Sequence, residues 1–440
     1  MSTTHPNILW DVVEDHLDEA EFLIGQWLVA ARSPRFSLEL LQTTLERRLD
    51  AQLDGLAVGG SEVADGLLWA TLEDGSIGSE AFFTACGLGL LADETGSAAP
   101  RLIDLLNTTD KPKVRNGLRN AFLLGGSPAT IEAVRLALYA SDSPPVQAAI
   151  LAVLAARRID PGPILGPLLE RDAEVRAPAV QALAAAPDSA RGSLLPRVEQ
   201  LLADDAPGVR AAARRTGLIW NLEPAWRSCA AQAQAGAPDA LLYLAMLDGA
   251  AALPWFASGL ASPERRPAVL FALGFTGLPE AVDLCLPWLD DPEIAVARLA
   301  GEAVGTITGL ELDDSRYATR RKPQPAQDLP PLEDDLREDL MPTPVDMLPV
   351  PIAGAIRDWW SERRSAFTAG RRYLYGHPFT VNTVQAALLI GPLRPTGALA
   401  CELAIRSAGE TQLPALHLGY PSPTLPPRLE SALHRPPRWR

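Results

Sequence analysis

The sequence predicts an all-α protein built as a solenoid, in which short helical hairpins stack between helical caps at the N- and C-terminal ends. Two observations support this prediction. Of the 440 residues, 47% are apolar but only 6% are aromatic, so the apolar content is mostly alanine, leucine and valine. One turn-plus-helix pattern also recurs from about residue 80 to residue 310. Each copy is too small to bury its own apolar face, so the copies are expected to stack.

Residues 1–79 are predicted to form the N-terminal helical cap. Apolar residues recur at helical spacing over 9–28, and Ser33-Pro34 then interrupts the pattern. Ser37 is a favourable N-cap for a second helix, in which leucines recur every three or four residues over 38–56.

Residues 80–310 are predicted to form the solenoid itself. Each copy has an Asp/Pro turn, a valine or isoleucine, usually an arginine, and then an Ala/Leu-rich helix. Four of the valines stand 32, 29 and 34 residues apart, namely Val114, Val146, Val175 and Val209. The turns stop one helix and start the next at a fixed angle. Stacked copies would therefore share one continuous core.

Residues 311–351 are predicted to form a Pro-rich acidic linker. Eight prolines lie between Pro323 and Pro351. A single arginine, Arg337, is opposed by a set of acidic residues, which are Asp328, Glu333, Asp334, Asp335, Glu338 and Asp339. This composition favours an extended chain, which is either disordered or draped over the solenoid.

The remaining chain is predicted to contain a helical segment, 352–420, and a Pro/Arg-rich tail, 421–440. Helices are expected over 381–390 and 396–408. The helical segment begins with a cluster of aromatic and basic residues that are candidates for protein binding, namely Trp359, Trp360, Arg363, Arg364, Arg371, Arg372, Tyr373 and Tyr375. Tryptophan, tyrosine and arginine are enriched in binding hot spots, and arginine also stacks on aromatic rings.

Two interpretations of this cluster remain open. In the first, Trp359 or Trp360 packs into the end of the solenoid as part of a C-terminal cap. In the second, the cluster contacts a protein partner. The neighbouring acidic linker could neutralise the cluster and mask such a site.

A second candidate set is the arginine that follows the valine in three repeats, which is Arg115, Arg176 and Arg210. In a solenoid these side chains would form a ladder along one side. They either pair with turn aspartates of the adjacent repeat or form a contact stripe for an acidic partner.

The repeat pattern D-x-x-V-R-x-x-A-x-x-A-L resembles HEAT-like repeats of the kind found in phycobilisome lyases. Four segments flank or end the repeats, in the order HLDEAEFLIGQWLVAARSP, LERRLDAQLDGLAVGG, RLAGEAVGTITGLEL and DWWSERRSAFTAGRRYLYGHP. Together they are similar to a bacterial family of HEAT-like proteins of unknown activity, whose genes often lie beside type VI secretion components. The resemblance implies association with the secretion machinery or an effector, and it carries over no catalytic residues.

The charge of the chain limits its partners. The net charge of −15 argues against bulk binding to nucleic acid or anionic lipid, since both require a positive face. No membrane insertion is expected, because the longest uncharged run, 373–393, contains His377 and Asn382. The N-terminal residues have no basic region of a secretory signal, so we expect a cytoplasmic protein.

No motif for catalysis, a cofactor or a metal was found. The sequence has no GxSxG elbow, no phosphate-binding loop and no dinucleotide fingerprint. No two of the five histidines stand three or four residues apart. The four cysteines form no CxxC pair and are expected to be buried thiols, namely Cys86, Cys229, Cys285 and Cys401.

These observations favour a non-catalytic protein-binding scaffold or adaptor, associated with type VI secretion through the family resemblance. One alternative is an immunity protein that neutralises a toxin effector, for which the acidic charge suits a basic nuclease. Another is a HEAT-like enzyme, either a lyase or a DNA glycosylase. A glycosylase would need a basic groove with aromatic residues. The partner, the face that binds it and the oligomeric state do not follow from the sequence.

Overall fold

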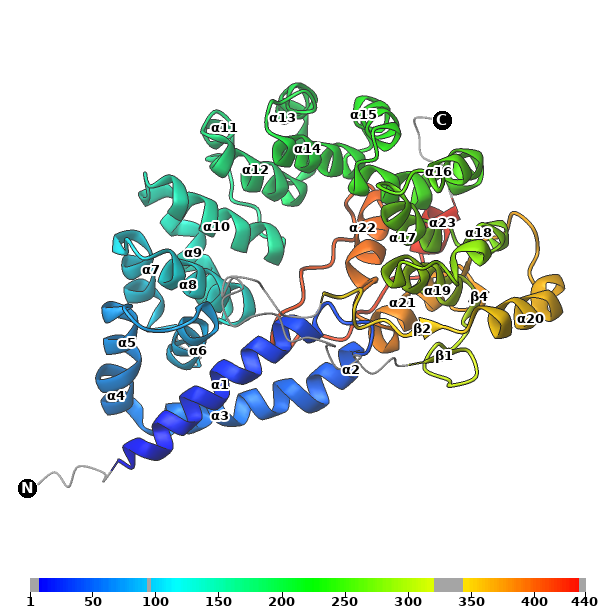
Figure 1. Cartoon of the computed structure of the whole chain (residues 1–440). Coiled ribbons are helices and arrows are strands. Elements are labelled where there is room, and N and C mark those ends of the chain that lie inside the picture. Colours follow the sequence, from blue (N-terminus) through cyan, green and yellow to red (C-terminus); the bar gives the residue numbers. More distant parts are fainter. Residues whose placement is uncertain (1–7, 93–95, 320–342, 435–440) are drawn as a thin grey trace, which may run out of the picture. The chain divides into compact units, whose positions relative to one another are not determined.

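The computed structural model describes residues 8–92, 96–319 and 343–434 (Figure 1). Helices account for most of these residues, which confirms the all-α class. The chain divides into two compact units, each assembled from separate stretches of sequence. Unit 1 comprises residues 1–31, 38–225 and 407–422, and unit 2 comprises 32–37, 226–406 and 423–440. Neither unit coincides with a single segment expected from the sequence.

Unit 1 begins with a long helix that packs on two later ones. α1 (Trp10–Ala30) contacts α3 (Arg47–Val58) and α6 (Glu80–Leu91). Shorter elements connect them, which are α2 (Leu38–Leu41), the π-helical turn η1 (Gln42–Glu46), α4 (Gly60–Val63), the π-helical turn η2 (Ala64–Trp69) and α5 (Ala70–Asp74). α1 ends at Ala30, close to the break expected from Ser33-Pro34, and α3 ends at Val58, two residues beyond the leucine pattern expected over 38–56.

Five helices of unit 1 pack against one another in sequence order. They are α6, α8 (Pro112–Leu124), α10 (Pro144–Arg157), α12 (Ala173–Ala182) and α14 (Pro207–Ile219). The intervening elements are α7 (Ala99–Thr108), α9 (Pro128–Ala140), α11 (Leu165–Leu168), η3 (Leu183–Ala185) and α13 (Asp188–Leu201). The boundary between the units falls within the next helix, α15 (Glu223–Gln234), most of which belongs to unit 2. The four valines of the sequence pattern are all buried in this packing.

Small residues bring the packed helices of unit 1 close together. A Cβ at Gly87 of α6 would lie 2.7 Å from the Cβ of Ala121 of α8, and one at Gly117 would lie 2.5 Å from the Cβ of Phe83. Side chains larger than hydrogen do not fit at these two positions, because real Cβ atoms do not approach so closely. The close contact of α6 with α8 therefore depends on glycine.

Residues 407–422, here called the strap, are extended rather than helical and lie along the ends of the packed helices (Figure 1). Gln412 Nε2 donates to Ala184 O at 2.6 Å, just after α12. Ala415 N–H donates to Ala156 O of α10 at 2.8 Å, and Leu418 N–H donates to Leu124 O of α8 at 3.0 Å. The strap thus follows the helices in reverse sequence order, and it uses mainly backbone groups to do so.

The strap ends against the first helices of unit 1. Gly419 N–H donates to Glu46 Oε2 at 3.0 Å, and Trp27 Nε1 of α1 donates to Glu46 Oε1 at 2.9 Å. Burial raises the pKa of the Glu46 carboxyl, and these two hydrogen bonds oppose that effect. Glu46 lies in the π-helical turn η1 and holds α1 and the strap together.

Unit 2 contains the remaining helices and the strands of the described chain. Its helices are α16 (Pro238–Gly259), α17 (Arg266–Thr276), α18 (Pro279–Cys285), η4 (Leu286–Trp288), α19 (Ile294–Thr308), α20 (Ala353–Arg363), η5 (Arg364–Ala366), α21 (Val381–Ile390), α22 (Thr396–Arg406) and α23 (Leu429–His434). α16 packs on α17, and α17 packs on α19. α21 spans the range expected from the sequence, and α23 places a helical turn within the Pro/Arg-rich tail.

Two short antiparallel pairs of strands complete unit 2. β1 (Ala318–Thr319) pairs with β2 (Val350–Pro351), and β3 (Tyr373–Leu374) pairs with β4 (His377–Pro378). β1 and β2 lie at the two ends of the expected linker 311–351, which are therefore held together. The acidic residues of that linker, from Asp328 to Asp339, lie outside the described residues, and so does the masking hypothesis built on them.

Within the described ranges, α16 is the one helix long and apolar enough to cross a membrane, by length and composition alone. Asp248 interrupts it with non-helical angles, φ −142° and ψ 32°, so two shorter helices meet there. Half of its apolar window is buried, as in the core helix of a soluble protein. The packing is compatible with a soluble chain, and the cellular compartment stays a prediction.

Candidate functional site

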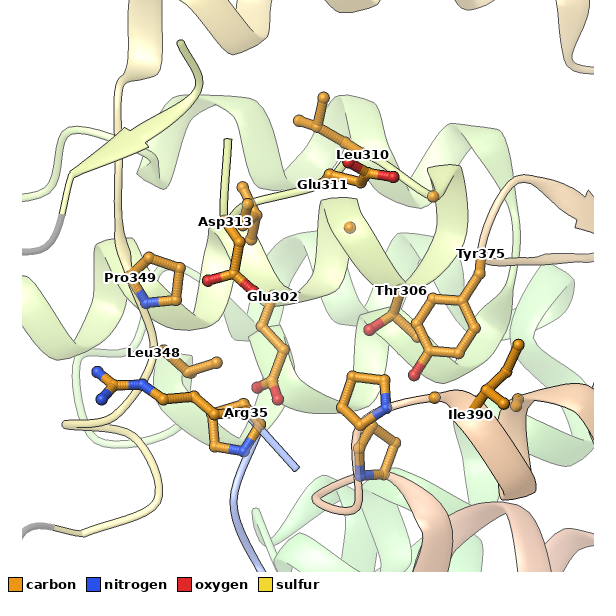
Figure 2. Close-up of a pocket in the computed structure, with 18 of the residues that line it drawn as sticks. Arg35, Glu302, Thr306, Leu310, Glu311, Asp313, Leu348, Pro349, Tyr375 and Ile390 are labelled. Atoms are coloured by element: carbon orange, nitrogen blue, oxygen red, sulfur yellow. The ribbon is translucent and has the colours of Figure 1, made fainter. Parts of the chain in front are cut away.

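A cavity of about 660 Å³ lies within unit 2. Its walls come from α19, the turn after it, the β3–β4 turn, α21, the loop 391–395 and residues 34–35 (Figure 2). The volume is in the range of small-molecule sites, which combine mostly apolar walls with a few convergent polar groups. The apolar lining includes Leu310, Leu312, Leu348, Pro349, Ile390 and Pro392.

Helix α19 places two polar side chains on the wall of this cavity. Glu302 and Thr306 are four residues apart and therefore share one face of the helix. The β3–β4 turn closes against the end of α19, where Tyr375 N–H donates to Thr306 O at 2.7 Å and Gly376 N–H donates to Ile307 O at 3.0 Å. These bonds satisfy carbonyls that the last turn of a helix leaves without an intrahelical partner.

The close contact between α19 and the β3–β4 turn requires glycine on both sides. Gly309 has φ +73°, and a Cβ there would lie 2.5 Å from Tyr375 O. Gly376 has φ +78°, and its Cβ would lie 2.6 Å from Thr308 O. Tyr375 itself has φ +49°, a backbone conformation uncommon for a non-glycine residue. The turn thus holds the Tyr375 ring in the cavity wall, opposite Glu302 (Figure 2).

Glu302 is the most buried ionisable group of the cavity. Its Oε1 accepts a hydrogen bond from Arg394 Nε at 2.7 Å, and the two side chains are 11% and 14% exposed. Burial raises the pKa of Glu302, and the charge and hydrogen bond of Arg394 oppose the rise. Its Oε2 is buried and accepts no hydrogen bond from the described residues. A buried carboxylate with an unsatisfied oxygen is costly unless a further donor completes it.

Tyr375 remains a neutral phenol. Burial is the main cause that raises its pKa well above the ordinary value, and the negative charge of Glu302 raises it further. Its hydroxyl can therefore donate or accept a hydrogen bond but does not act as a base near neutral pH. No hydrogen bond from the described residues occupies this hydroxyl or that of Thr306.

The charged groups around the cavity are mostly acidic. Glu302, Glu311 and Asp313 line it, of which Glu311 and Asp313 are exposed, and the basic residues of the lining are Arg35 and the exposed His377. Arg35 Nε donates to Met347 O at 3.0 Å. Figure 2 shows its guanidinium directed away from Glu302. The cavity therefore has mostly apolar walls with hydroxyl and carboxylate groups among them, and Arg394 pairs with Glu302.

The polar groups of this cavity can bind a ligand. Glu302 is held by Arg394, and Tyr375 is protonated, so neither is arranged as a general base beside a nucleophile. Among the residues that the structure describes, no group of three or more His, Cys, Asp or Glu side chains could hold a metal ion. All four cysteines are buried thiols, as expected from the sequence.

The aromatic and basic cluster expected to bind protein is largely used in packing within unit 2. Trp360 is buried, and its Nε1 donates to Asp283 Oδ1 at 2.7 Å. Phe367 lies between Trp360 and Tyr373, with ring centroids 5.3 and 4.9 Å away. Arg364 lies over Trp360 and bonds Asp283 Oδ2 at 3.3 Å. These contacts fix α20 against α18.

The other members of the cluster divide between two roles. Arg372 is bound by Glu402 and by the carbonyls of Phe275 and Thr276, and Tyr375 lines the cavity. Arg371 is exposed beside Tyr373. Trp359 is half-buried, and exposed Arg363 lies over its ring at 5.5 Å. The structure thus brings the predicted residues into one region, but not into one binding surface.

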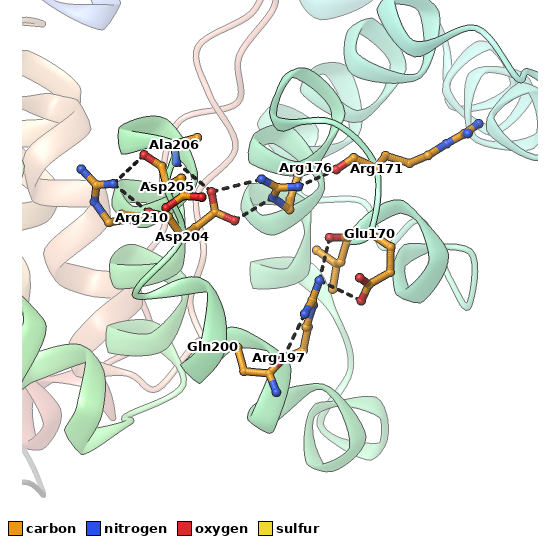
Figure 3. A network of polar contacts seen from close by, with 10 residues as sticks. Glu170, Arg171, Arg176, Arg197, Gln200, Asp204, Asp205, Ala206 and Arg210 are labelled. Atoms are coloured by element: carbon orange, nitrogen blue, oxygen red, sulfur yellow. Dashed lines mark hydrogen bonds and ion pairs between the residues drawn. The ribbon is translucent and has the colours of Figure 1, made fainter.

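The repeat arginines of unit 1 differ in their partners (Figure 3). Arg176 Nε pairs with Asp204 Oδ2 of the next turn at 2.8 Å, and the side chains are 20% and 10% exposed. Arg210 instead donates to the carbonyls of Asp204 and Asp205 at 2.7 and 2.8 Å, and Arg115 donates to Thr109 O at 2.9 Å. Pairing with the adjacent turn thus holds for Arg176, whereas the other two hold their own turns.

The turn network lowers the pKa of Asp204. Partial burial raises that pKa, but the hydrogen bonds from Ala206 N–H and Arg176, with the charge of Arg176, outweigh it. In unit 1, Gln147 follows Val146 as Arg210 follows Val209, and its Nε2 donates to Ser141 O of the preceding turn at 2.7 Å. In unit 2, Arg266 Nε donates likewise to Leu260 O at 2.9 Å. A donor in the first turn of a repeat helix therefore closes the preceding turn.

Sequence reasoning missed the groups with the most perturbed environments. Glu302 and Glu402 each lie in an otherwise apolar helical segment, AGEAVG and ACELAI. A lone acidic residue among buried small residues was a usable signal, because such a charge needs a partner. The partners themselves, Arg394 for Glu302 and Arg372 for Glu402, are far away in the sequence.

Comparison with known proteins adds no family. No family model and no curated protein matches the chain. An engineered protein solved by the Northeast Structural Genomics Consortium aligns with 66% of this chain and 83% of its own, at 18% identity and a TM-score of 0.27. A TM-score this low carries no argument about the fold. The resemblance to the secretion-associated HEAT-like family stays a prediction.

Proposed function

We propose that this chain is a HEAT-like helical scaffold that binds a protein partner without catalysing a reaction. Two features support the repeat assignment. Helices α6, α8, α10, α12 and α14 pack in sequence order. In both units, an arginine in the first turn of a repeat helix closes the preceding turn onto a backbone carbonyl, as Arg210 and Arg266 do. Stacked repeats offer extended surfaces for protein binding.

The observation that carries the binding site is a pair on α20, half-buried Trp359 and exposed Arg363. Trp360, Arg364 and Arg372 are occupied by internal contacts. Trp359 and Arg363 remain accessible as a stacked pair. A tryptophan held in place by neighbouring rings loses little entropy on binding, and Trp and Arg are frequent hot-spot residues. We therefore place the partner contact on Trp359 and Arg363.

We propose a component of type VI secretion, or an effector that it handles, as the partner, in the cytoplasm. The family resemblance supports this choice. The immunity-protein alternative is favoured by the net charge of −15, which would attract a basic toxin. The enzyme alternative, a lyase or a DNA glycosylase, has less support, because the charged groups that line the cavity of unit 2 are mainly carboxylates, which would repel the phosphates of DNA.

The test is capture of the tagged protein from its native host, followed by titration of the purified partner. Trp359→Ala should raise the dissociation constant for the partner roughly tenfold or more, as expected for a hot-spot residue. Phe22→Ala is the matched control, because Phe22 is an exposed aromatic residue of unit 1. Trp360→Ala is unsuitable because it would also unfold the α20–α18 contact.

Three results would decide between the alternatives. A secretion component whose affinity falls only with Trp359→Ala supports the scaffold. A toxin that is inhibited by the protein in an activity assay supports the immunity function. Equal affinity for wild type and Trp359→Ala, or recovery of nucleic acid alone, contradicts the proposed site.

A further inference from the structure

No ligand has been assigned to the cavity of unit 2, and some of its polar groups have no hydrogen-bond partner among the described residues. Apolar residues form most of the wall, and the interior polar groups are Glu302, Thr306 and Tyr375 (Figure 2). Oε2 of Glu302 is buried and accepts no hydrogen bond from the described part of the chain. The missing partner of this oxygen is a hydrogen-bond donor, since a carboxylate oxygen can only accept.

The charge around the cavity selects the kind of donor. Glu311 and Asp313 add negative charge at the same cavity, whereas Arg35 is tied to Met347 O and is directed away from Glu302. An anionic ligand would be disfavoured by the buried charge of Glu302 and, more weakly, by the solvent-exposed carboxylates of Glu311 and Asp313. A cation would be attracted, and its N–H groups would serve as the donors that Glu302 lacks.

We propose that this cavity binds a small amphiphilic cation, which is a primary amine or guanidine attached to an apolar group. The charged head would donate to Glu302, with the hydroxyls of Thr306 and Tyr375 beside it. The apolar part would lie against Leu310, Leu348 and Ile390. This inference does not depend on the scaffold function, because it uses neither Trp359 nor Arg363.

The geometry also disfavours two other occupants. A metal ion would need several ligands converging on one point, and Glu302 is the single buried carboxylate of the cavity. An uncharged apolar molecule would leave Oε2 without a donor and would gain nothing from Glu311 or Asp313. The cation thus fits the wall and the buried acceptor together.

The test compares three ligands that have similar shapes but different charges. Binding of 2-phenylethylamine, 2-phenylethanol and phenylacetate to the full chain is measured by isothermal titration calorimetry near neutral pH. The amine should bind at least about tenfold more tightly than the alcohol, because a charge-assisted hydrogen bond is lost. Phenylacetate should not bind. Equal binding of all three, or no binding of the amine at millimolar concentration, overturns the proposal.

Variants locate the site. Glu302→Gln should weaken amine binding roughly ten- to a hundredfold. Because this change also removes the ion pair with Arg394, Ala386→Trp provides a second variant. Ala386 lines the cavity and is exposed, so a large side chain there covers the mouth without replacing a core residue. Amine binding that survives Ala386→Trp unchanged contradicts the site, and Glu362→Gln on exposed α20 is the control.

A second set of probes distinguishes two sources of the cation. Capped lysine, acetylated at Nα and amidated at its carboxyl group, presents the amine as a protein side chain does. If it binds as tightly as 2-phenylethylamine, the cavity accepts a partner's lysine. If only the free amine binds, the cavity accepts a small molecule. The affinity of the protein partner for Trp359→Ala is measured separately, so failure of either proposal leaves the other intact.

Discussion

Units 1 and 2 use charged residues in different ways. In unit 1, arginines hold turns near the surface, as Arg176 does with Asp204 and Arg210 with two carbonyls. In unit 2, opposite charges pair with one another in the interior, whereas buried Glu46 of unit 1 is held by neutral donors. Glu402 is 2% exposed and accepts hydrogen bonds from Arg372 and Arg406, each at 2.6 Å. Glu302 likewise pairs with Arg394 inside the cavity wall.

The difference shows that similar helices can be held either by arginines bound to turns or by buried ion pairs. An arginine that binds a turn carbonyl exchanges a hydrogen bond to water for one to that carbonyl. The net gain in stability is therefore small. A buried charge must be matched by its surroundings, because desolvation is costly unless a partner compensates it. Unit 1 is therefore expected to tolerate polar substitutions that unit 2 does not.

The largest expected effect is in unit 2. Glu402→Gln leaves Arg372 and Arg406 without a countercharge in a buried site, so the free energy of unfolding should fall by about 3 to 5 kcal/mol. Urea denaturation followed by circular dichroism measures this change. Glu362→Gln, on the exposed side of α20, is the control and should change stability by less than about 0.5 kcal/mol.

The pH dependence of stability provides a second readout for the same variant. Burial raises the pKa of Glu402, but the charges of Arg372 and Arg406 outweigh it and hold the pKa below its ordinary value of 4.5. A carboxyl with a lowered pKa in the folded state stabilises the protein above pH 4.5 and loses this contribution as the pH falls through the lowered value. Glu402→Gln should flatten the stability profile there. An unchanged profile would contradict the ion-pair assignment.

An intermediate effect is expected from the strap in unit 1. Ala415→Pro removes the N–H that donates to Ala156 O, and should lower stability by about 1 to 3 kcal/mol. Ala415→Ser keeps the N–H at the same exposed position and serves as the control. Hydrogen exchange should accelerate at α8 and α10 in the proline variant. If both variants exchange alike, the strap does not stabilise these helices through its backbone.

The smallest effect distinguishes the repeat arginines from one another. A double-mutant cycle of Arg176→Ala and Asp204→Ala should give a coupling energy of about 1 kcal/mol, because the pair is partly buried. The cycle of Arg210→Ala with Asp205→Ala should give a coupling near zero, since Arg210 contacts carbonyls that alanine retains. Urea denaturation of the single and double variants measures both. A coupling in the second cycle as large as in the first would contradict this distinction.

The sequence predicted the local features of the fold better than the distant ones. Proline at the first helical position marks the start of α8, α10 and α14, and buried valines mark their inner faces. Both features act within one turn of helix, so the sequence pattern reports them. The contact of Arg176 with the next turn was one of the two alternatives that the repeat offered.

The strap and the cavity were not predictable in this way. Residues 407–422 bind unit 1 mainly through N–H and C=O groups, which every residue has, so no side-chain pattern reveals them. They were expected within the helical segment 352–420. The cavity depends on Gly309 and Gly376 approaching backbone atoms, and on an ion pair that joins Glu302 to Arg394. Such contacts are set by how distant segments meet in the fold, so the spacing of residues along the sequence does not reveal them.

The strap also affects the order in which the protein can fold during synthesis. Residues 38–225 leave the ribosome before residues 226–406, and only then do residues 407–422 follow. At about 5 to 20 residues per second, translation of the intervening stretch takes roughly 10 to 40 s. Throughout that interval the strap donors of the carbonyls of Leu124, Ala156 and Ala184 have not been synthesised, so water can bind these carbonyls instead. The N-terminal helices can therefore complete these contacts only after residues 407–422 have been synthesised.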